Sequence, residues 1–300
     1  MKILITGKNG QLGRALIKEI PKVFKSKDVE ILGVTRNEFN LLEPKACESF
    51  LKEYKPNWLI NTAAYTNVEK AEKEPSLARD VNTIAPKLLA EMISNNGGKM
   101  LHLSTDFVFS GEKGKPYITE EIMKPKCVYG ITKCEGEKAV RKYLNKDGYI
   151  LRTSWLYGDV GKNFLLTMLK LQKQYAYRNK SIKVISDQVG CPTSVTSLSN
   201  VCWEIIKQNG GNIPKVLHWS DAGAASWYDF AIAIRNISYD QGLIKEKVEI
   251  EPIKASEYSS NVPRPYYSIL DCSITEKILK LKAEHWQKTL SKIIANINNN

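Results

Sequence analysis

The sequence predicts an α/β protein in which a doubly wound parallel sheet is joined to a smaller C-terminal cap. Three features of the 300 residues lead to this fold class. Short apolar runs alternate with helical patterns in the first half, a glycine-rich turn follows the first run, and proline-containing loops break up the second half. Alternating β and α units favour a parallel sheet with helices on both faces and right-handed crossovers.

The apolar runs of the first half mark its strands. Residues 3–5 form the first run, and apolar residues at helical spacing follow from Leu12 until Pro21 ends the pattern. The remaining strands of this half are expected at 29–34, 58–60, 100–103 and 149–151. The remaining helices are expected at 45–54, 78–94 and 129–144. Each of the first four strands is thus followed by a helix, as parallel neighbours require.

The second half is less regular. Strands are expected at 183–186 and 216–219, and helices at 197–207 and 227–236. We predict a sheet domain at residues 1–155 and a cap that takes up most of residues 156–300. A segment at about 190–220 is expected to return to the sheet domain.

Composition argues against several classes of protein. An apolar share of 43% supports a sizeable core, and no run of about 18 apolar residues indicates a membrane span. The first apolar stretch is too short for a signal peptide, so a cytoplasmic protein is expected. Six scattered cysteines and three dispersed histidines favour free thiols over a zinc site. The net charge of +12 suits anionic ligands, but no nucleic-acid-binding motif accompanies it, so no nucleic-acid partner is expected.

A glycine-rich turn lies between the first strand and the first helix. Its glycines are Gly7, Gly10 and Gly13, in the spacing G-x-x-G-x-x-G. Gly7 permits a tight turn, Gly10 lets the backbone approach a pyrophosphate, and Gly13 allows close packing of helix on strand. The helix N-terminus adds free N–H groups and the positive end of its dipole. The flanking strand and helix favour a dinucleotide site over an ordinary glycine-rich turn.

The end of the second strand indicates which dinucleotide binds. An acidic residue here would bond the 2′-hydroxyl of NAD, but the sequence reads Gly33-Val34-Thr35-Arg36. The guanidinium of Arg36 suits a bidentate contact with a 2′-phosphate. We therefore predict NADPH as the cofactor, with NADH and a solvent-facing Arg36 as the alternatives.

A tyrosine and a lysine stand four residues apart at the start of a predicted helix. Tyr129 and Lys133 therefore share one helix face. A nearby ammonium lowers a tyrosine pKa, so the pair suits proton donation in carbonyl reduction, and Lys133 can also bond a cofactor ribose. The preceding strand ends in Ser104-Thr105, where a hydroxyl can bond the substrate carbonyl. A solvated surface pair is the alternative for a Y-x-x-x-K pattern on its own.

The order of glycine turn, Ser/Thr strand end and Y-x-x-x-K resembles the extended short-chain dehydrogenase/reductases, which have a Rossmann-type sheet. Further blocks closely resemble the dTDP-4-dehydrorhamnose reductase family and extend the match from residue 3 to about 271. These blocks are NTAAYT at 61–66, STDFVFSG at 104–111, VYGITK at 128–133, RTSWLYG at 152–158, DQVGCPT at 187–193, SWYDF at 226–230 and RPYYSILD at 264–271. The resemblance makes residues 1–155 an NAD(P)-binding Rossmann domain and the cap a substrate-binding domain.

The resemblance implies a reductase of deoxysugar biosynthesis for cell-surface polysaccharide. Members transfer hydride from NAD(P)H to C4 of dTDP-4-dehydro-β-L-rhamnose, which gives dTDP-β-L-rhamnose. By match to the family motifs, Tyr129 donates the proton, Lys133 supports it and Thr105 completes the catalytic set. The expected cofactor-binding residues are Gly7, Gly10, Gln11, Leu12, Gly13, Arg36, Ala63, Ala64, Tyr65, Tyr129 and Lys133.

The expected substrate is a dTDP-linked keto-deoxysugar. Its binding residues by the same match are Thr105, Asp106, Tyr129, Trp155 and Arg264. A basic fork suits a diphosphate, so Arg264 is the candidate for that group. The alternatives are a core aromatic for Trp155 and a surface ion pair for Arg264.

One departure from the family bears on metals and assembly. Some members form a magnesium-bridged dimer through a glutamate early in the first helix, where this chain has Ala15. We therefore expect neither Mg²⁺ nor that dimer, while another kind of homodimer stays open.

Other functions within this fold remain as alternatives. One is a reductase of another nucleotide-linked 4-keto-deoxysugar, since a fold does not fix the sugar. A second is an epimerase or dehydratase with tightly held NAD, against which the missing acid after Val34 and the cap motifs argue. A third is a non-catalytic subunit that resembles the regulatory subunit of methionine adenosyltransferase. The joint presence of Thr105, Tyr129 and Lys133 favours chemistry.

Overall fold

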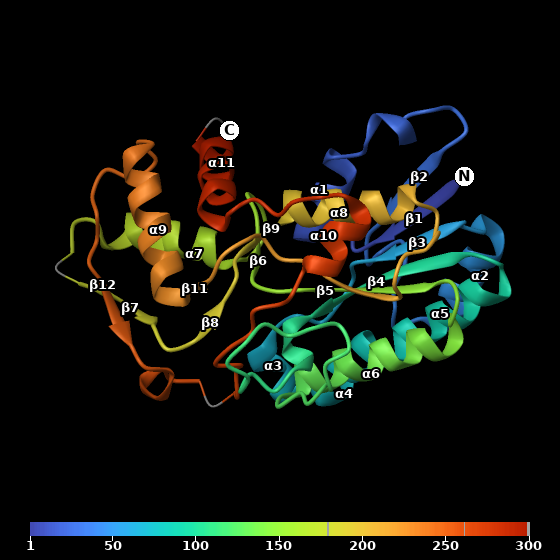
Figure 1. Ribbon diagram of the computed structural model, residues 1–300, viewed down its shortest axis with the longest axis horizontal. Helices are drawn as coiled ribbons and strands as arrows, with labels where there is room; N and C mark the ends of the chain where they lie inside the picture. The colour runs from blue at the N-terminus through green and yellow to red at the C-terminus, as the bar shows by residue number, and fades with distance from the viewer. Residues whose placement is uncertain (179, 261, 299–300) are drawn as a thin grey trace.

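The computed structural model describes residues 1–178, 180–260 and 262–298 and confirms the α/β fold class (Figure 1). Its central sheet has six parallel strands in the order β10-β5-β4-β3-β1-β2. The strand order reverses between β1 and β3, which opens a crevice at the carboxyl ends of these strands. The strands are β1 Lys2–Thr6, β2 Glu30–Val34, β3 Trp58–Asn61, β4 Lys99–Thr105, β5 Gly148–Thr153 and β10 Val216–His218.

Helices cover both faces of the sheet because successive residues of a strand point to opposite sides. Ile3 and Ile5 of β1 pack with the layer of α1, α8 and α10, whereas Leu4 packs with that of α2, α5 and α6. In Figure 1 the first layer lies above the sheet and the second below it. The helices are α1 Gln11–Lys18, α2 Pro44–Tyr54, α5 Ala85–Asn95, α6 Val128–Tyr143, α8 Val195–Lys207 and α10 Ser273–Leu279.

The helix predicted at 78–94 is interrupted in the structure. Helix α4 (Pro75–Arg79) runs into a π-helical turn at Asp80–Ile84 before α5 begins. Asn82 in this turn exchanges hydrogen bonds with the backbone of Tyr65 at 2.8 and 3.0 Å. The π-helical turn therefore contacts the loop that follows β3. Helical periodicity in the sequence does not reveal such a tertiary contact.

Most elements that follow β5 form the cap at the left of Figure 1. Its core is built by Leu169 of α7, Phe230 of α9 and Leu290 of α11. Three two-stranded sheets complete it, and β10 lies outside it because this strand pairs with β5 in the central sheet. The cap elements are α7 Phe164–Tyr175, α9 Trp227–Asp240, α11 Trp286–Asn298, β6 Leu156–Tyr157, β7 Ile182–Ile185, β8 Val189–Gly190, β9 Thr193–Ser194, β11 Ala225–Ser226 and β12 Ile250–Ile253.

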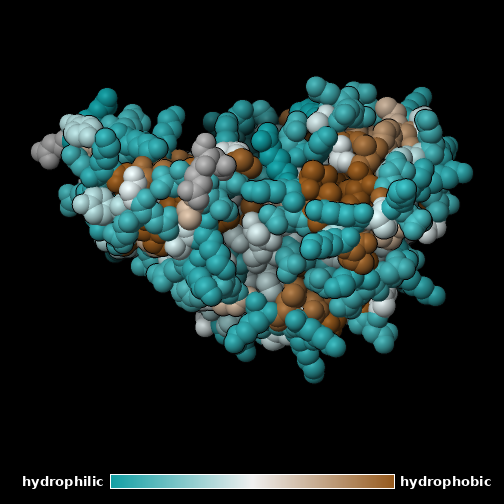
Figure 2. Space-filling view, turned by 90° about the horizontal axis from the view of Figure 1, so that it is seen from above, coloured by the Kyte–Doolittle hydropathy of each residue, from teal (hydrophilic) through white to brown (hydrophobic). Residues whose placement is uncertain are grey.

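The surface seen from above is mostly hydrophilic, with hydrophobic side chains in separate patches (Figure 2). In the part of the chain that the structure describes, no helix is both long and apolar enough to cross a membrane. The six cysteines are unpaired, and five of them are buried.

Candidate active site

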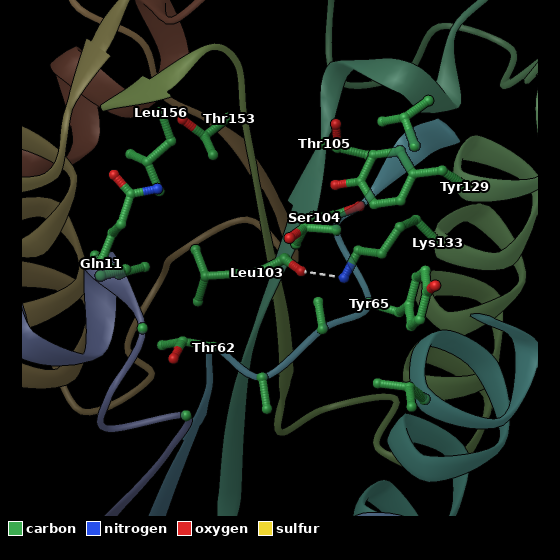
Figure 3. Close-up of a pocket in the computed structure, with 18 of the residues that line it drawn as sticks. Gln11, Thr62, Tyr65, Leu103, Ser104, Thr105, Tyr129, Lys133, Thr153 and Leu156 are labelled. Carbon is green, nitrogen blue, oxygen red and sulfur yellow. Dashed lines mark hydrogen bonds between the residues drawn. The ribbon is translucent and has the colours of Figure 1, made fainter. Parts of the chain in front are cut away.

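A cavity of about 710 Å³ lies where the carboxyl ends of the central strands meet the cap. Figure 3 shows its walls, with Gln11 on one side and Tyr129 and Lys133 on the other. Most of the residues that the sequence marks as functional line it. These are Gly7, Gly10, Gln11, Leu12, Arg36, Ala63, Ala64, Tyr65, Thr105, Asp106, Tyr129, Lys133, Trp155 and Arg264.

The glycine turn forms one end of the cavity. Gly7 has a φ of 71°, and a Cβ on it would lie 2.8 Å from Oγ1 of Thr62. Gly10 caps α1 without a side-chain hydrogen bond, which leaves N–H groups of the first turn for an anion. Gly13 does not line the cavity, and its role is packing, since a Cβ there would lie 2.2 Å from the Gly7 carbonyl oxygen. The turn therefore has the close backbone and the N–H groups that a phosphate cradle requires.

Arg36 lies at the cavity beside the turn, just after β2. The nearest carboxylate along the chain, Glu38, accepts a hydrogen bond from the backbone N–H of Thr35 at 2.8 Å. This bond lowers the pKa of Glu38. Glu38 is thus held by the local backbone, and Arg36 lines this end of the cavity, where a guanidinium suits a phosphate better than a ribose hydroxyl.

Lys133 reaches the cavity from the second turn of α6. Its side chain is buried, and Nζ donates to the carbonyl oxygen of Leu103 at 2.6 Å, the bond dashed in Figure 3. Nε2 of His102 lies 3.3 Å from the same nitrogen. Burial lowers the pKa of Lys133 to about 8, and the negative charge of Glu137 opposes this effect. Lys133 is thus held from behind and titrates close to neutral pH.

Tyr129 precedes Lys133 by one helical turn and lies beside Thr105 in Figure 3. The expectation that the lysine lowers the tyrosine pKa is wrong. Burial raises the pKa of Tyr129, the hydroxyl of Thr105 opposes this, and the charge of Asp106 adds to it. The lysine ammonium is not among the groups that shift this pKa. The phenol therefore holds its proton at neutral pH, although it is a weaker acid than an exposed tyrosine.

The hydroxyl of Thr105 has a local partner. It donates to Oδ1 of Asp106 at 2.9 Å and accepts from the backbone N–H of Phe107 at 3.2 Å. Asp106 is buried, and burial raises its pKa to about 6. The pair places a hydroxyl and a carboxyl group in the wall of the cavity that also holds Tyr129.

The cap supplies an aromatic wall. Trp155 stacks on Trp227 with ring centroids 3.5 Å apart and planes 5° from parallel. The backbone of Trp155 has a φ of 45°, which is unusual for a bulky residue. Gly190 admits the indole, since a Cβ there would lie 2.4 Å from Cε2 of Trp155. Trp155 lines the cavity and also packs on the cap core. It is therefore a core aromatic that also presents a surface to the cavity.

Arg264 crosses from the cap to the sheet domain. Its Nη2 donates to Oε1 of Glu69 at 2.7 Å, and Oγ of Ser260 donates to the same oxygen at 2.6 Å. Glu69 belongs to α3 (Val68–Lys73). Arg264 therefore forms an ion pair and lines the cavity at the same time.

Several residues of the site were missed at the sequence level. Asn163 Nδ2 donates to Oε1 of Gln11 at 2.8 Å and ties the cap to the glycine turn. Trp227 lines the cavity, and its place in the SWYDF block was a usable signal. No local pattern marks His102, which reaches the site through Lys133.

Ala15 is buried in the core. In residues 1–178, 180–260 and 262–298, no three His, Cys, Asp or Glu side chains gather as metal ligands would.

Comparison with known proteins identifies similar chains. The sequence profile described as the RmlD substrate binding domain matches residues 1–299. A dTDP-4-dehydrorhamnose reductase from Sinorhizobium fredii is 35% identical over 298 residues, which are 98% of this chain and 97% of that protein. The structure of a dTDP-4-dehydrorhamnose reductase from Clostridium acetobutylicum is 37% identical, with a TM-score of 0.88 and coverage of 99% and 100%. That of Bacillus anthracis, in complex with NADP, is 30% identical, with a TM-score of 0.88 and coverage of 98% and 99%.

Proposed function

The chain belongs to the RmlD substrate binding domain family, and on this premise we propose that it reduces dTDP-4-dehydro-β-L-rhamnose to dTDP-β-L-rhamnose at the expense of NADPH. One observation carries the proposal. The glycine turn, Arg36, Thr105, Tyr129 and Lys133 line a single cavity, although they come from distant parts of the chain. Such a cavity brings a hydride donor and a proton donor to one carbonyl.

The cavity fits a phosphorylated dinucleotide. The backbone cradle at Gly7 and Gly10 and the free N–H groups at the start of α1 suit a pyrophosphate. Arg36 beside this turn suits the 2′-phosphate that distinguishes NADP from NAD. When bound, NADPH supplies the hydride.

The protein supplies the proton and the orientation. Tyr129 donates its phenolic proton to the keto oxygen, which gains a hydrogen as C4 gains the hydride, so a ketone becomes a secondary alcohol. Thr105 and Asp106 line the same cavity, and we assign them to contact with the sugar near its carbonyl. Lys133, fixed by Leu103, is the residue that we assign to the cofactor ribose.

The cap holds the rest of the substrate. The indole of Trp155, stacked on Trp227, offers an apolar face to a deoxysugar ring. Arg264 exchanges its contact with Glu69 for the diphosphate, which offers more charge to the guanidinium.

A coupled assay tests the function. The keto-sugar is generated in the same tube from dTDP-glucose by the upstream dehydratase and epimerase, and the control omits this protein. We expect NADPH oxidation in step with formation of dTDP-rhamnose. A keto-sugar isomer of unchanged oxidation state, formed only when this protein is present and without net NADPH consumption, would favour an epimerase. NADPH binding without turnover on any keto-deoxysugar would favour a regulatory subunit.

A further inference from the structure

A row of polar side chains crosses the apolar sheet beneath the cavity. The parallel register places Thr6 of β1 opposite Asn61 of β3, and Asn61 opposite His102 of β4. All three are buried, with exposed fractions of 1%, 1% and 0%. Burial of a polar group on folding costs free energy unless the group is hydrogen-bonded, so we expect each member of this row to have a hydrogen-bond partner.

The members of the row bond to one another. Thr6 Oγ1 donates to Oδ1 of Asn61 at 2.7 Å, and the Asn61 amide nitrogen lies 3.0 Å from Nδ1 of His102. The other ring nitrogen of His102 lies 3.3 Å from Nζ of Lys133. The row therefore runs from the first strand of the sheet to the lysine in the cavity wall.

Lys133 is the one member that also reaches the cavity. An ammonium group has three hydrogens. The Leu103 carbonyl accepts one of them, and Nε2 of His102 lies against the same nitrogen from behind, which leaves a hydrogen for a ligand in the cavity. Two fixed partners also restrict a side chain that otherwise has many rotamers.

The row accommodates Lys133 in both of its charge states. A neutral imidazole carries one N–H, and His102 stays neutral because burial and the charge of Lys133 hold its pKa well below the ordinary value. When Nδ1 accepts from the Asn61 NH₂, Nε2 donates to an uncharged Lys133 amine. When the Asn61 amide presents its oxygen, Nδ1 donates and Nε2 accepts from a charged Lys133.

We propose that His102 is a positioning residue, which holds the Lys133 amine through Nε2 so that one amine hydrogen stays directed at the cofactor ribose. Asn61 and Thr6 fix the imidazole ring in turn. The proposal rests on the proposed function, which places the cofactor beside Lys133. His102 itself contacts neither cofactor nor substrate.

Two matched substitutions isolate the Nε2 contact. In His102→Gln the side-chain amide extends to the place of Nε2, whereas in His102→Asn it extends only to the place of Nδ1 and keeps the contact with Asn61. Both variants are polar and smaller than histidine, so their folding and thermal stability can be compared directly by circular dichroism. NADPH affinity is measured by fluorescence titration and kcat by the coupled assay, each from pH 6 to 10.

Titratable groups around Lys133 set the shape of these pH profiles. These groups are Glu137 of α6, which pairs with Arg152 of β5; Tyr129 of α6; Asp106 after β4; and Tyr65 after β3. Since the same groups are present in both variants, a difference between the two pH profiles reports the contact with residue 102.

We expect His102→Asn to lose about tenfold in NADPH affinity, the effect of one charge-assisted hydrogen bond. A loss in kcat of up to about 10²-fold follows from a misplaced lysine. Loss of the acceptor disfavours the charged amine, so the decline of affinity and kcat with rising pH begins at lower pH than in the wild type. His102→Gln should follow the wild-type profile within about twofold, since it restores the acceptor.

Equal impairment of the two variants would overturn the proposal, because residue 102 would then act through packing alone. Wild-type behaviour of His102→Asn would overturn it as well. Failure of the proposed function is a separate result: a wild-type protein that reduces no keto-sugar still binds NADPH, and the titration across pH still separates the two variants.

Discussion

The carboxylate of Glu137 lies 2.7 Å from the guanidinium of Arg152, and the two side chains are 0% and 2% exposed. Ser104 donates to the same carboxylate, and Arg152 donates to the backbone carbonyl of Thr119 at 3.1 Å. Glu137 follows Lys133 by one turn of α6. The ion pair therefore fastens this helix to β4 and β5 directly under the cavity.

Removing one charge of this pair should strongly destabilise the protein. Glu137→Gln leaves the Arg152 guanidinium buried without a counter-charge, and we expect a loss of about 3–5 kcal/mol in the free energy of unfolding. Urea denaturation followed by circular dichroism measures it. Glu48→Gln is the control, because the Glu48–Lys52 pair is exposed and its loss should cost at most about 1 kcal/mol. Equal costs for the two variants would contradict the role of the buried pair.

Lys133 should make the stability of the protein depend on pH. The folded pKa of about 8 lies below the ordinary value of 10.5, so between these values the unfolded chain holds a proton that the folded chain has released. The pH-dependent contribution of Lys133 to the free energy of unfolding is complete above pH 10.5, and it is lost as the pH falls through 8. The free energy of unfolding of the wild type, minus that of Lys133→Met, should rise with pH in this window by at most about 1.4 kcal/mol per unit. A constant difference would show that the lysine pKa is not lowered.

Tyr129→Phe should keep the fold and NADPH affinity but lose turnover. The phenylalanine ring fills the same space, and only the proton donor is gone, so kcat should fall by about 10²–10⁴-fold. Phe107 packs edge-on against this ring at 5.4 Å and keeps its partner in the variant. Steady-state kinetics and NADPH fluorescence give the two quantities, and a fully active variant would remove Tyr129 from the proposed role.

Much of the fold and part of the site are predictable because their signals are local. The strands follow from apolar runs, the glycine turn from three residues in seven, and the shared face of Tyr129 and Lys133 from a spacing of four. The π-helical turn at Asp80–Ile84 has no such signal, because it depends on the contact between Asn82 and the Tyr65 backbone.

Long-range register and burial account for what the sequence does not reveal. The bonds that join Thr6, Asn61 and His102 link residues 55 and 41 positions apart, and they exist because the sheet aligns three strands. The pKa of Tyr129 was predicted in the wrong direction because desolvation by residues packed around the tyrosine raises it, and this packing is not visible in the helix spacing. Both effects depend on packing.

Arg36→Ala should weaken NADPH binding while NADH binding changes little. The guanidinium is the group placed for the 2′-phosphate, and the loss of a charge-assisted contact corresponds to about 10- to 10²-fold in affinity. Lys45→Ala, on the exposed start of α2, is a control for a change of net charge alone. Parallel fluorescence titrations with both cofactors make the comparison. An unchanged preference for NADPH would show that Arg36 does not read the phosphate.

The most direct test of the proposed reaction follows the hydride itself. The keto-sugar is reduced with NADPH that carries deuterium at C4 of the nicotinamide, on the face that the enzyme uses, and the product is analysed by proton NMR. We predict dTDP-β-L-rhamnose with deuterium at sugar C4, formed by the wild type and at a much lower rate by Tyr129→Phe. Deuterium at another carbon, or a product without deuterium, would contradict direct hydride transfer to C4 in this cavity.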